Sequence, residues 1–280
     1  MRISIRHETR YDYAEPAAGV FMRLRLWPRT TNGQTVESWQ VSVNGAAVRQ
    51  LTVNGYGDGE TVWRAPGRIE TVTIVAEGDV ATIDCAGVTR ALPGEVQPRL
   101  FLRETPLTAP DEALRALAEQ VRSPDGDALS SLHALCVLIG EAVPWRAGST
   151  TVETTAAEAF AQRAGVCQDQ THIFIAAART LGIPTRYVVG YLRDPERPDS
   201  DHDPHAWAES WLDGLGWVAF DCTLGHCPVE GHVRLCCGLD AADAAPIRGV
   251  MLSAGETKLS HDVQIANLPS GDAAQAQTQQ

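Results

Sequence analysis

The spacing of apolar residues changes once along this chain, and that change limits the folds open to it. Up to about residue 87, apolar and polar residues alternate, as they do around Ile3 and Ile5. A period of two is typical of strands with one buried face. After about residue 109, apolar residues recur at helical spacing, for example Leu114, Leu117 and Val121. We therefore expect a β-rich region followed by a region of helices and strands.

The sequence predicts an α+β protein of two domains. Residues 1–87 contain closely spaced strands separated by turn signals, which favours an antiparallel β-sandwich that serves as a scaffold or positions substrate. Residues 88–108 are interrupted by prolines and are expected to form a linker, and residues 109–266 to form the second domain. Residues 267–280 are rich in Ala, Gln and Ser and are expected to be disordered.

Composition argues against several classes of partner. The 23 Lys and Arg residues against 35 Asp and Glu give a net charge of −12. Phosphate binding needs an excess of basic residues, so we expect neither nucleic acid nor a membrane as a partner. No apolar run is long enough to span a bilayer, and residues 1–8 carry charges where a signal peptide needs an apolar segment. We expect a cytoplasmic protein; its oligomeric state is not predicted.

One of the seven cysteines stands apart from the others by its position. The odd number and irregular spacing of the cysteines argue against a disulfide framework. Thr155 and Glu158 form a capping-box signature that begins a short helix, and Gly165 is expected to end it in a left-handed conformation. Cys167 then begins a second, buried helix. Unpaired N–H groups and the helix dipole favour the thiolate there, and the same N–H groups could bind an oxyanion.

A predicted hairpin carries a histidine and an aspartate that could serve this cysteine. Asp213-Gly214 is a strong turn signal between the arms 205–212 and 217–221, which begin with His205 and end with Asp221. If the numbers of paired residues add to 426 or 428, both side chains lie on one face within hydrogen-bonding reach. An odd register would place them on opposite faces. The sequence leaves these registers open.

Four ordered motifs resemble the transglutaminase-like superfamily: Gly165-Val166-Cys167-Gln168-Asp169, residues 181–187, His205-Ala206-Trp207-Ala208-Glu209 and residues 214–221. Residues 2–13 and 24–29 resemble the β-rich N-terminal region of its bacterial branch. The resemblance covers nearly the whole chain. It implies a papain-like catalytic domain preceded by the antiparallel β domain.

The resemblance also implies the chemistry. Cys167 would be the nucleophile, His205 the base and then the acid, and Asp221 the residue that orients His205. The substrate would be a peptide or isopeptide-type amide, attacked without a cofactor to give a thioester. Water would complete a hydrolysis and an amine a transamidation; hydrolysis is favoured because no feature indicates an amine-binding site. A protein-glutamine transamidase and a non-catalytic binding scaffold of the same fold remain alternatives.

Further residues are assigned more loosely. Trp145, Gln168 and Trp207 are expected to bind substrate or the oxyanion. Cys222 stands where family members commonly have proline, which leaves the loop after Asp221 open to question. Glu209 shares a face with His205, and a solvated position is an equally good interpretation.

Two clusters suggest ligands. One, a run of Cys and His residues, raises a structural zinc site as an alternative, but the spacing lacks the usual ligand pairs, so we expect no metal. Its members are Cys222, His226, Cys227, His232, Cys236 and Cys237. The other is an acidic segment that could form a rim for amine-bearing substrates. It contains Asp194, Glu196, Asp199, Asp201 and Asp203.

Overall fold

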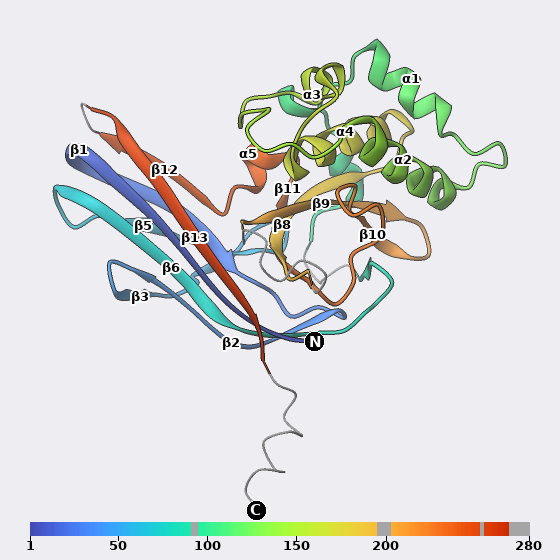
Figure 1. The fold of residues 1–280 in the computed structure, drawn as a ribbon. Helices are drawn as coiled ribbons and strands as arrows, with labels where there is room; N and C mark the ends of the chain where they lie inside the picture. Colours follow the sequence, from blue (N-terminus) through green and yellow to red (C-terminus); the bar gives the residue numbers. More distant parts are fainter. Residues whose placement is uncertain (91–94, 195–202, 253–254, 269–280) are drawn as a thin grey trace, which may run out of the picture.

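A computed structural model describes residues 1–90, 95–194, 203–252 and 255–268. Within these residues the strands form two antiparallel sheets, one of eight strands and one of five (Figure 1). No helix in these ranges is long and apolar enough to cross a membrane.

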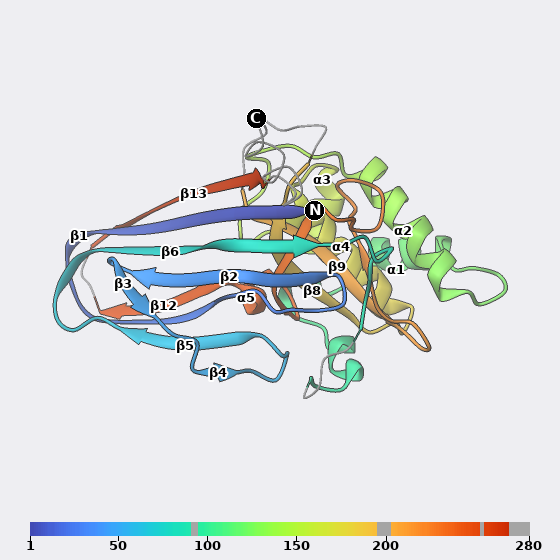
Figure 2. The same cartoon turned by 90° about the horizontal axis from the view of Figure 1, so that it is seen from below.

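The larger sheet is built around one long strand, β1 (Arg2–Trp27), which turns back on itself. Gly19 has a φ of +72°, a conformation that favours glycine, at the point where the pairing of β1 shifts. The two halves of β1 therefore lie in two layers (Figures 1 and 2). Ile5 from the first half and Leu24 from the second belong to one buried core. The other N-terminal strands are β2 (Gln34–Val43), β3 (Ala46–Val48), β4 (Thr52–Val53), β5 (Gly59–Arg64) and β6 (Ile69–Thr82).

The C-terminal segment returns to this sheet, which differs from the predicted domain boundary. Residues 247–266 were expected in the second domain, but β12 (Ile247–Leu252) and β13 (Thr257–Asn267) both pair with β1. Val263 and Ile265 are buried, and Ile265 lies opposite Ile5. Their alternation with polar residues predicts a strand but carries no information about which sheet that strand joins. Disorder was expected from residue 267, but Asn267 is the last residue of β13 and pairs with Ile3; residues 269–280 lie outside the described ranges.

The smaller sheet has the order β11-β8-β9-β10-β7, and helices cover one of its faces (Figure 1). Ala206 and Ala208 point from this sheet into the core formed with the helices, while Tyr191 and Val233 belong to the core of the N-terminal sheet. The opposite face of β9 carries Trp207 and Glu209, which are buried as well, so the five-stranded sheet is packed on both faces. Its strands are β7 (Val88–Thr89), β8 (Thr185–Leu192), β9 (His205–Leu212), β10 (Gly216–Phe220) and β11 (His232–Gly238). The helices are α1 (Glu112–Gln120), α2 (Ala128–Ala142), α3 (Ala156–Gln162), α4 (Cys167–Thr180) and α5 (Ala241–Ala244).

The described part of the expected linker, residues 88–90 and 95–108, packs against the second domain. Its strand β7 pairs with β10, and it forms the short 3₁₀ helices η1 (Pro98–Leu102) and η2 (Pro106–Thr108). Arg179 of α4 donates hydrogen bonds of 2.8 Å to the carbonyl of Phe101 and to the hydroxyl of Thr108. These contacts make the segment part of the packing around α4.

A buried row of alternating charges joins the two parts of the molecule, and we call it the buried charge ladder. Three guanidinium groups alternate with three carboxylates, in the order Arg25, Asp58, Arg234, Glu209, Arg186 and Glu95. The N···O distances along it are 2.7, 3.4, 3.3, 2.6 and 3.5 Å. Glu209 is only 1 % exposed, so the solvated interpretation of this residue is wrong. It lies on the face of β9 that the N-terminal sheet covers.

Candidate active site

Cys167 is the first residue of α4, where its thiol is half-buried. The start of this helix is held by Asp169, whose Oδ2 accepts hydrogen bonds of 2.7 Å from the Val166 N–H and from the Thr150 hydroxyl. The first N–H groups of a helix have no intrahelical acceptor, so they remain available to an anion beside Cys167. The position predicted from the helix signals is therefore the observed one.

The turn that precedes Cys167 differs from the prediction in one detail. Thr155 and Glu158 do form the predicted capping box at the start of α3. The left-handed residue that ends α3, however, is Arg163 with a φ of +53°, and Gly165 is not left-handed. Gly165 is instead required by close packing, because a Cβ there would lie 2.7 Å from the Cβ of Asp169.

The hairpin brings His205 and Asp221 together. Trp217 pairs with Trp211 and Phe220 with Ala208, so paired numbers add to 428, one of the two registers that place both side chains on one face. The Nε2 of His205 lies 2.6 Å from the Oδ2 of Asp221, and both residues are buried. The ring also interacts with the side chain of Cys167. Because Nε2 is engaged by Asp221, the nitrogen left for the thiol is Nδ1.

The electrostatics of this group favour a charged imidazolium. Burial alone would lower the pKa of His205, but the charge and hydrogen bond of Asp221, together with Cys167, raise it to about 10. Burial alone would raise the pKa of Asp221, but His205 and a second histidine, His232, bring it well below its ordinary value. At neutral pH the histidine is therefore protonated beside a carboxylate, which is the environment that stabilises a neighbouring thiolate.

Asp221 is held on both of its oxygens despite the Cys222 that follows it. Its Oδ1 accepts the backbone N–H groups of Thr223 and Leu224 at 2.9 and 3.3 Å. The Thr223 hydroxyl donates at 2.6 Å to Gln170 of α4, which ties the loop to the helix of Cys167. Cys222 is buried, and burial together with contact with Cys136 raises the pKa of its thiol. The loop thus keeps the carboxylate in place without a proline.

The three residues expected to contact substrate lie in different surroundings. Trp145 is 57 % exposed and forms a β-bridge with Gly165, next to the nucleophile segment. Gln168 is half-buried in the first turn of α4. Trp207, by contrast, is only 2 % exposed and packs edge-on against His232, with ring centroids 5.4 Å apart. Trp207 therefore packs against the two histidines, and its side chain is buried instead of being exposed to a substrate.

The run of cysteines and histidines after Asp221 does not converge on one point. His226 contacts the carbonyl of Cys227, Cys236 donates to the carbonyl of Ala244, and His232 faces Asp221. Over the described ranges, one group of three possible ligands brings its donor atoms within 4.8 Å of one another, and it consists of His205, Asp221 and His232. The acidic segment contributes Asp203, which contacts His261 at 2.9 Å, whereas residues 195–202 lie outside the described ranges.

His232 is the site residue that sequence reasoning missed. Its Nε2 lies 3.1 Å from the same Asp221 oxygen that binds His205. It belongs to β11, which is separated from β9 by β8, so no spacing within a hairpin could reveal the contact. The only available signal was its place in the Cys and His run, which suggested a metal.

Comparisons with known proteins match both parts of the chain. Residues 115–222 match the transglutaminase-like superfamily, and residues 3–81 match the bacterial transglutaminase-like N-terminal region. An uncharacterized protein of Mycobacterium leprae is 28 % identical over 281 residues, covering 95 % of this chain and 99 % of its own. An uncharacterized protein of Mycobacterium tuberculosis is 27 % identical over 301 residues, which cover 98 % of this chain and 95 % of that protein. The crystal structure of a candidate cysteine protease from Cytophaga hutchinsonii is similar with a TM-score of 0.74 and 25 % identity, covering 96 % of this chain and 91 % of that one.

Proposed function

The chain belongs to the transglutaminase-like superfamily, with the N-terminal region of its bacterial branch, and from this we propose that it is a cysteine-nucleophile enzyme acting on peptide or isopeptide-type amides. The observation that carries the proposal is the geometry of the site: Cys167 is the first residue of a helix and interacts with His205, whose Nε2 lies 2.6 Å from Asp221 Oδ2. Cys167 is then the nucleophile, His205 the general base and acid, and Asp221 the residue that orients it.

The first half of the reaction forms a thioester. The Cys167 thiolate attacks the amide carbonyl, and the oxyanion that develops is bound by N–H groups at the start of α4, including that of Gln168. The C–N bond then breaks, and the imidazolium of His205 gives its proton to the leaving amine. The products are a free amine, an acyl group on sulfur and a neutral His205.

The second half decides between hydrolysis and transamidation. His205 takes a proton from water, and the resulting hydroxide attacks the thioester carbonyl. The C–S bond then breaks, which releases the acid product and regenerates the Cys167 thiolate beside the His205 imidazolium. An amine in place of water would give a new amide. We favour hydrolysis because the similar Cytophaga hutchinsonii protein is a candidate cysteine protease. The exposed Trp145, which forms a β-bridge with Gly165, is the aromatic side chain that we expect to contact the acyl donor.

The rate of Cys167 alkylation as a function of pH tests the proposal. At pH 6 an ordinary thiol of pKa about 8.5 is less than 1 % ionised, so a thiolate–imidazolium pair should react with iodoacetamide roughly 100 times faster. The advantage at pH 6 should disappear in His205→Ala. Mass spectrometry of digests gives the rate for each cysteine separately.

The half-buried Cys85 and Cys227 provide internal controls in the same digest. Alkylation of Cys167 at pH 6 no faster than that of Cys85, or unchanged in His205→Ala, would contradict the proposal and favour a binding scaffold of the same fold. Hydrolysis is then distinguished from transamidation by turnover of a peptide-amide library with added methylamine. Acid products support a hydrolase and methylamides a transamidase, and Cys167→Ala should form neither.

A further inference from the structure

His232 lies beside the candidate catalytic group, and the packing around it requires a glycine at position 190 on the neighbouring strand β8. It is almost fully buried on β11, and its ring contacts Asp221, which follows β10 on the far side of β8 and β9. The residue of β8 on this face, between β9 and β11, is Gly190, which pairs with both His205 and Arg234. A Cβ there would lie 2.6 Å from the Trp207 ring and 2.1 Å from the Val233 carbonyl. The missing side chain gives Trp207 room to pack against both histidines.

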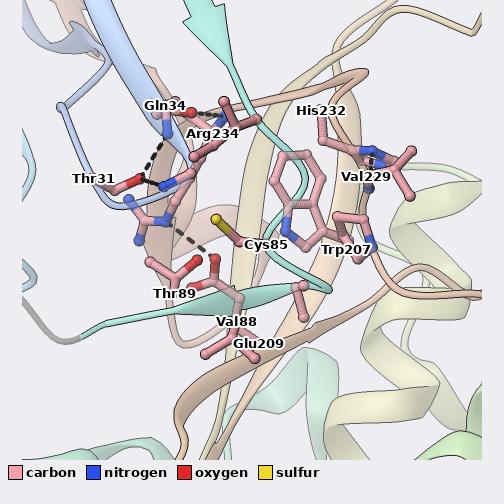
Figure 3. A pocket seen from close by; sticks show the side chains of 15 residues that line it. Thr31, Gln34, Cys85, Val88, Thr89, Trp207, Glu209, Val229, His232 and Arg234 are labelled. Atoms are coloured by element: carbon pink, nitrogen blue, oxygen red, sulfur yellow. Dashed lines mark hydrogen bonds and ion pairs between the residues drawn. The ribbon is translucent and has the colours of Figure 1, made fainter. Parts of the chain in front are cut away.

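The hydrogen bonds of His232 fix its tautomer. The backbone N–H of Val229 donates to Nδ1 at 3.2 Å, as seen in Figure 3, so Nδ1 carries a lone pair. The ring proton is then on Nε2 and points to Asp221. Burial lowers the pKa of His232, and together with the charge of His205 it outweighs the hydrogen bond and charge of Asp221, which raise that pKa, so the ring is neutral at neutral pH. A metal bound at Nε2 would need the opposite tautomer, which the Val229 N–H opposes.

We propose that His232 is a positioning residue whose Nε2–H holds Asp221 Oδ2 and shares its negative charge with His205. The proposal rests on the function proposed above. With Oδ1 bound by Thr223 and Leu224, the hydrogen bond from His232 fixes the second oxygen as well. Asp221 then presents one oriented lone pair to His205. A carboxylate bound to His205 alone would attract its proton more strongly, so His232 lowers the proton affinity of the catalytic base.

Few other charges face His232. A cavity of about 60 Å³ on one side of it is lined by Trp207, Cys85, Glu209 and Arg234 (Figure 3). The two charged groups among them pair with each other at 3.3 Å within the buried charge ladder. Among the residues that the structure describes, the other titratable groups that contact His232 are Asp221 and His205. The effect of His232 on His205 therefore passes through Asp221.

Two substitutions separate the hydrogen bond from the packing. His232→Phe keeps a ring against Trp207 but removes the donor, whereas His232→Gln keeps an N–H donor. The pKa of His205, followed by NMR titration of ¹³C-labelled histidine, should rise in His232→Phe by about 0.5–1 pH unit. It should return toward the wild-type value in His232→Gln. The His205 resonance is assigned by its loss in His205→Ala.

The outcomes distinguish this inference from the proposed function. An unchanged pKa of His205 in a folded His232→Phe protein, with only a lower melting temperature, would show a structural role alone and overturn the inference. Should His232→Phe not fold, ¹⁵N shifts of the wild type decide: we expect a neutral His232 with its proton on Nε2 at neutral pH, and a cationic ring or a proton on Nδ1 at that pH overturns the inference. Failure of the proposed function would instead appear as an unreactive Cys167 in the wild type.

Discussion

Replacing Asp221 by Asn is expected to lower the rate of thioester formation by about 10³–10⁴-fold. This side chain accepts four hydrogen bonds: two backbone N–H groups donate to Oδ1, and His205 and His232 donate to Oδ2. An amide offers one oxygen and one NH₂ group, so its NH₂ must face two donors in either orientation. The backbone groups cannot rotate away, and the tautomer of His232 is fixed by Val229.

His205 is the donor whose protonation state can change in this variant. Without the carboxylate the imidazolium would lose its Nε2 proton and keep the proton on Nδ1, and the neutral ring would then have no Nδ1 lone pair with which to accept a proton from Cys167. The measurement is the rate of Cys167 alkylation at pH 6, together with turnover once a substrate has been identified. Asp213→Asn, at the exposed hairpin turn, is the matched control and should behave as wild type. If folded Asp221→Asn loses less than tenfold in the rate of Cys167 alkylation at pH 6, the assigned roles are contradicted.

Local signals in the sequence predicted the geometry of the candidate site well. The capping box of Thr155 and Glu158 and the apolar pattern after Gly165 placed Cys167 at the start of a helix, as observed. The Asp213-Gly214 turn limited the hairpin to a few registers, and the observed one places His205 beside Asp221. Both predictions depend on neighbours fewer than 20 residues apart, where chain geometry restricts the possibilities. The catalytic roles themselves stay proposals.

The features that the sequence did not reveal depend on contacts between distant segments. β13 alternates like any half-buried strand, and only the assembled sheet shows that it lies beside β1. His232 contacts Asp221 although β8 and β9 lie between β11 and β10, and the missing side chain of Gly190 leaves room beside them for the Trp207 ring. Glu209 was predicted to share a face with His205, which is correct, but the pattern could not show that the N-terminal sheet covers that face.

Glu209 is also the residue whose charge should matter most for stability. Its carboxylate lies between Arg186 at 2.6 Å and Arg234 at 3.3 Å, and all three side chains are buried. Glu209→Gln keeps the size of the side chain but leaves two guanidinium groups in the interior with one carboxylate fewer. Breaking a buried ion pair in this way is expected to reduce the free energy of unfolding by about 3–5 kcal/mol. Urea denaturation at pH 7 measures the loss.

The pH dependence of the loss identifies the charge as its cause. Burial raises the pKa of Glu209, but Arg186 and Arg234 more than compensate and bring it below its ordinary value. A carboxyl with a depressed pKa in the folded state contributes its stability above the unfolded pKa, about 4.3, and loses it as the pH falls. The difference between wild type and Glu209→Gln should therefore be full at pH 7 and shrink as the pH is lowered below about 4.3. Glu119→Gln, which breaks an exposed ion pair with Arg122, should leave the free energy of unfolding unchanged both at pH 7 and below about pH 4.3. Equal losses in the two variants, or a Glu209→Gln loss independent of pH, would mean that the buried charge ladder does not stabilise the junction between the two sheets.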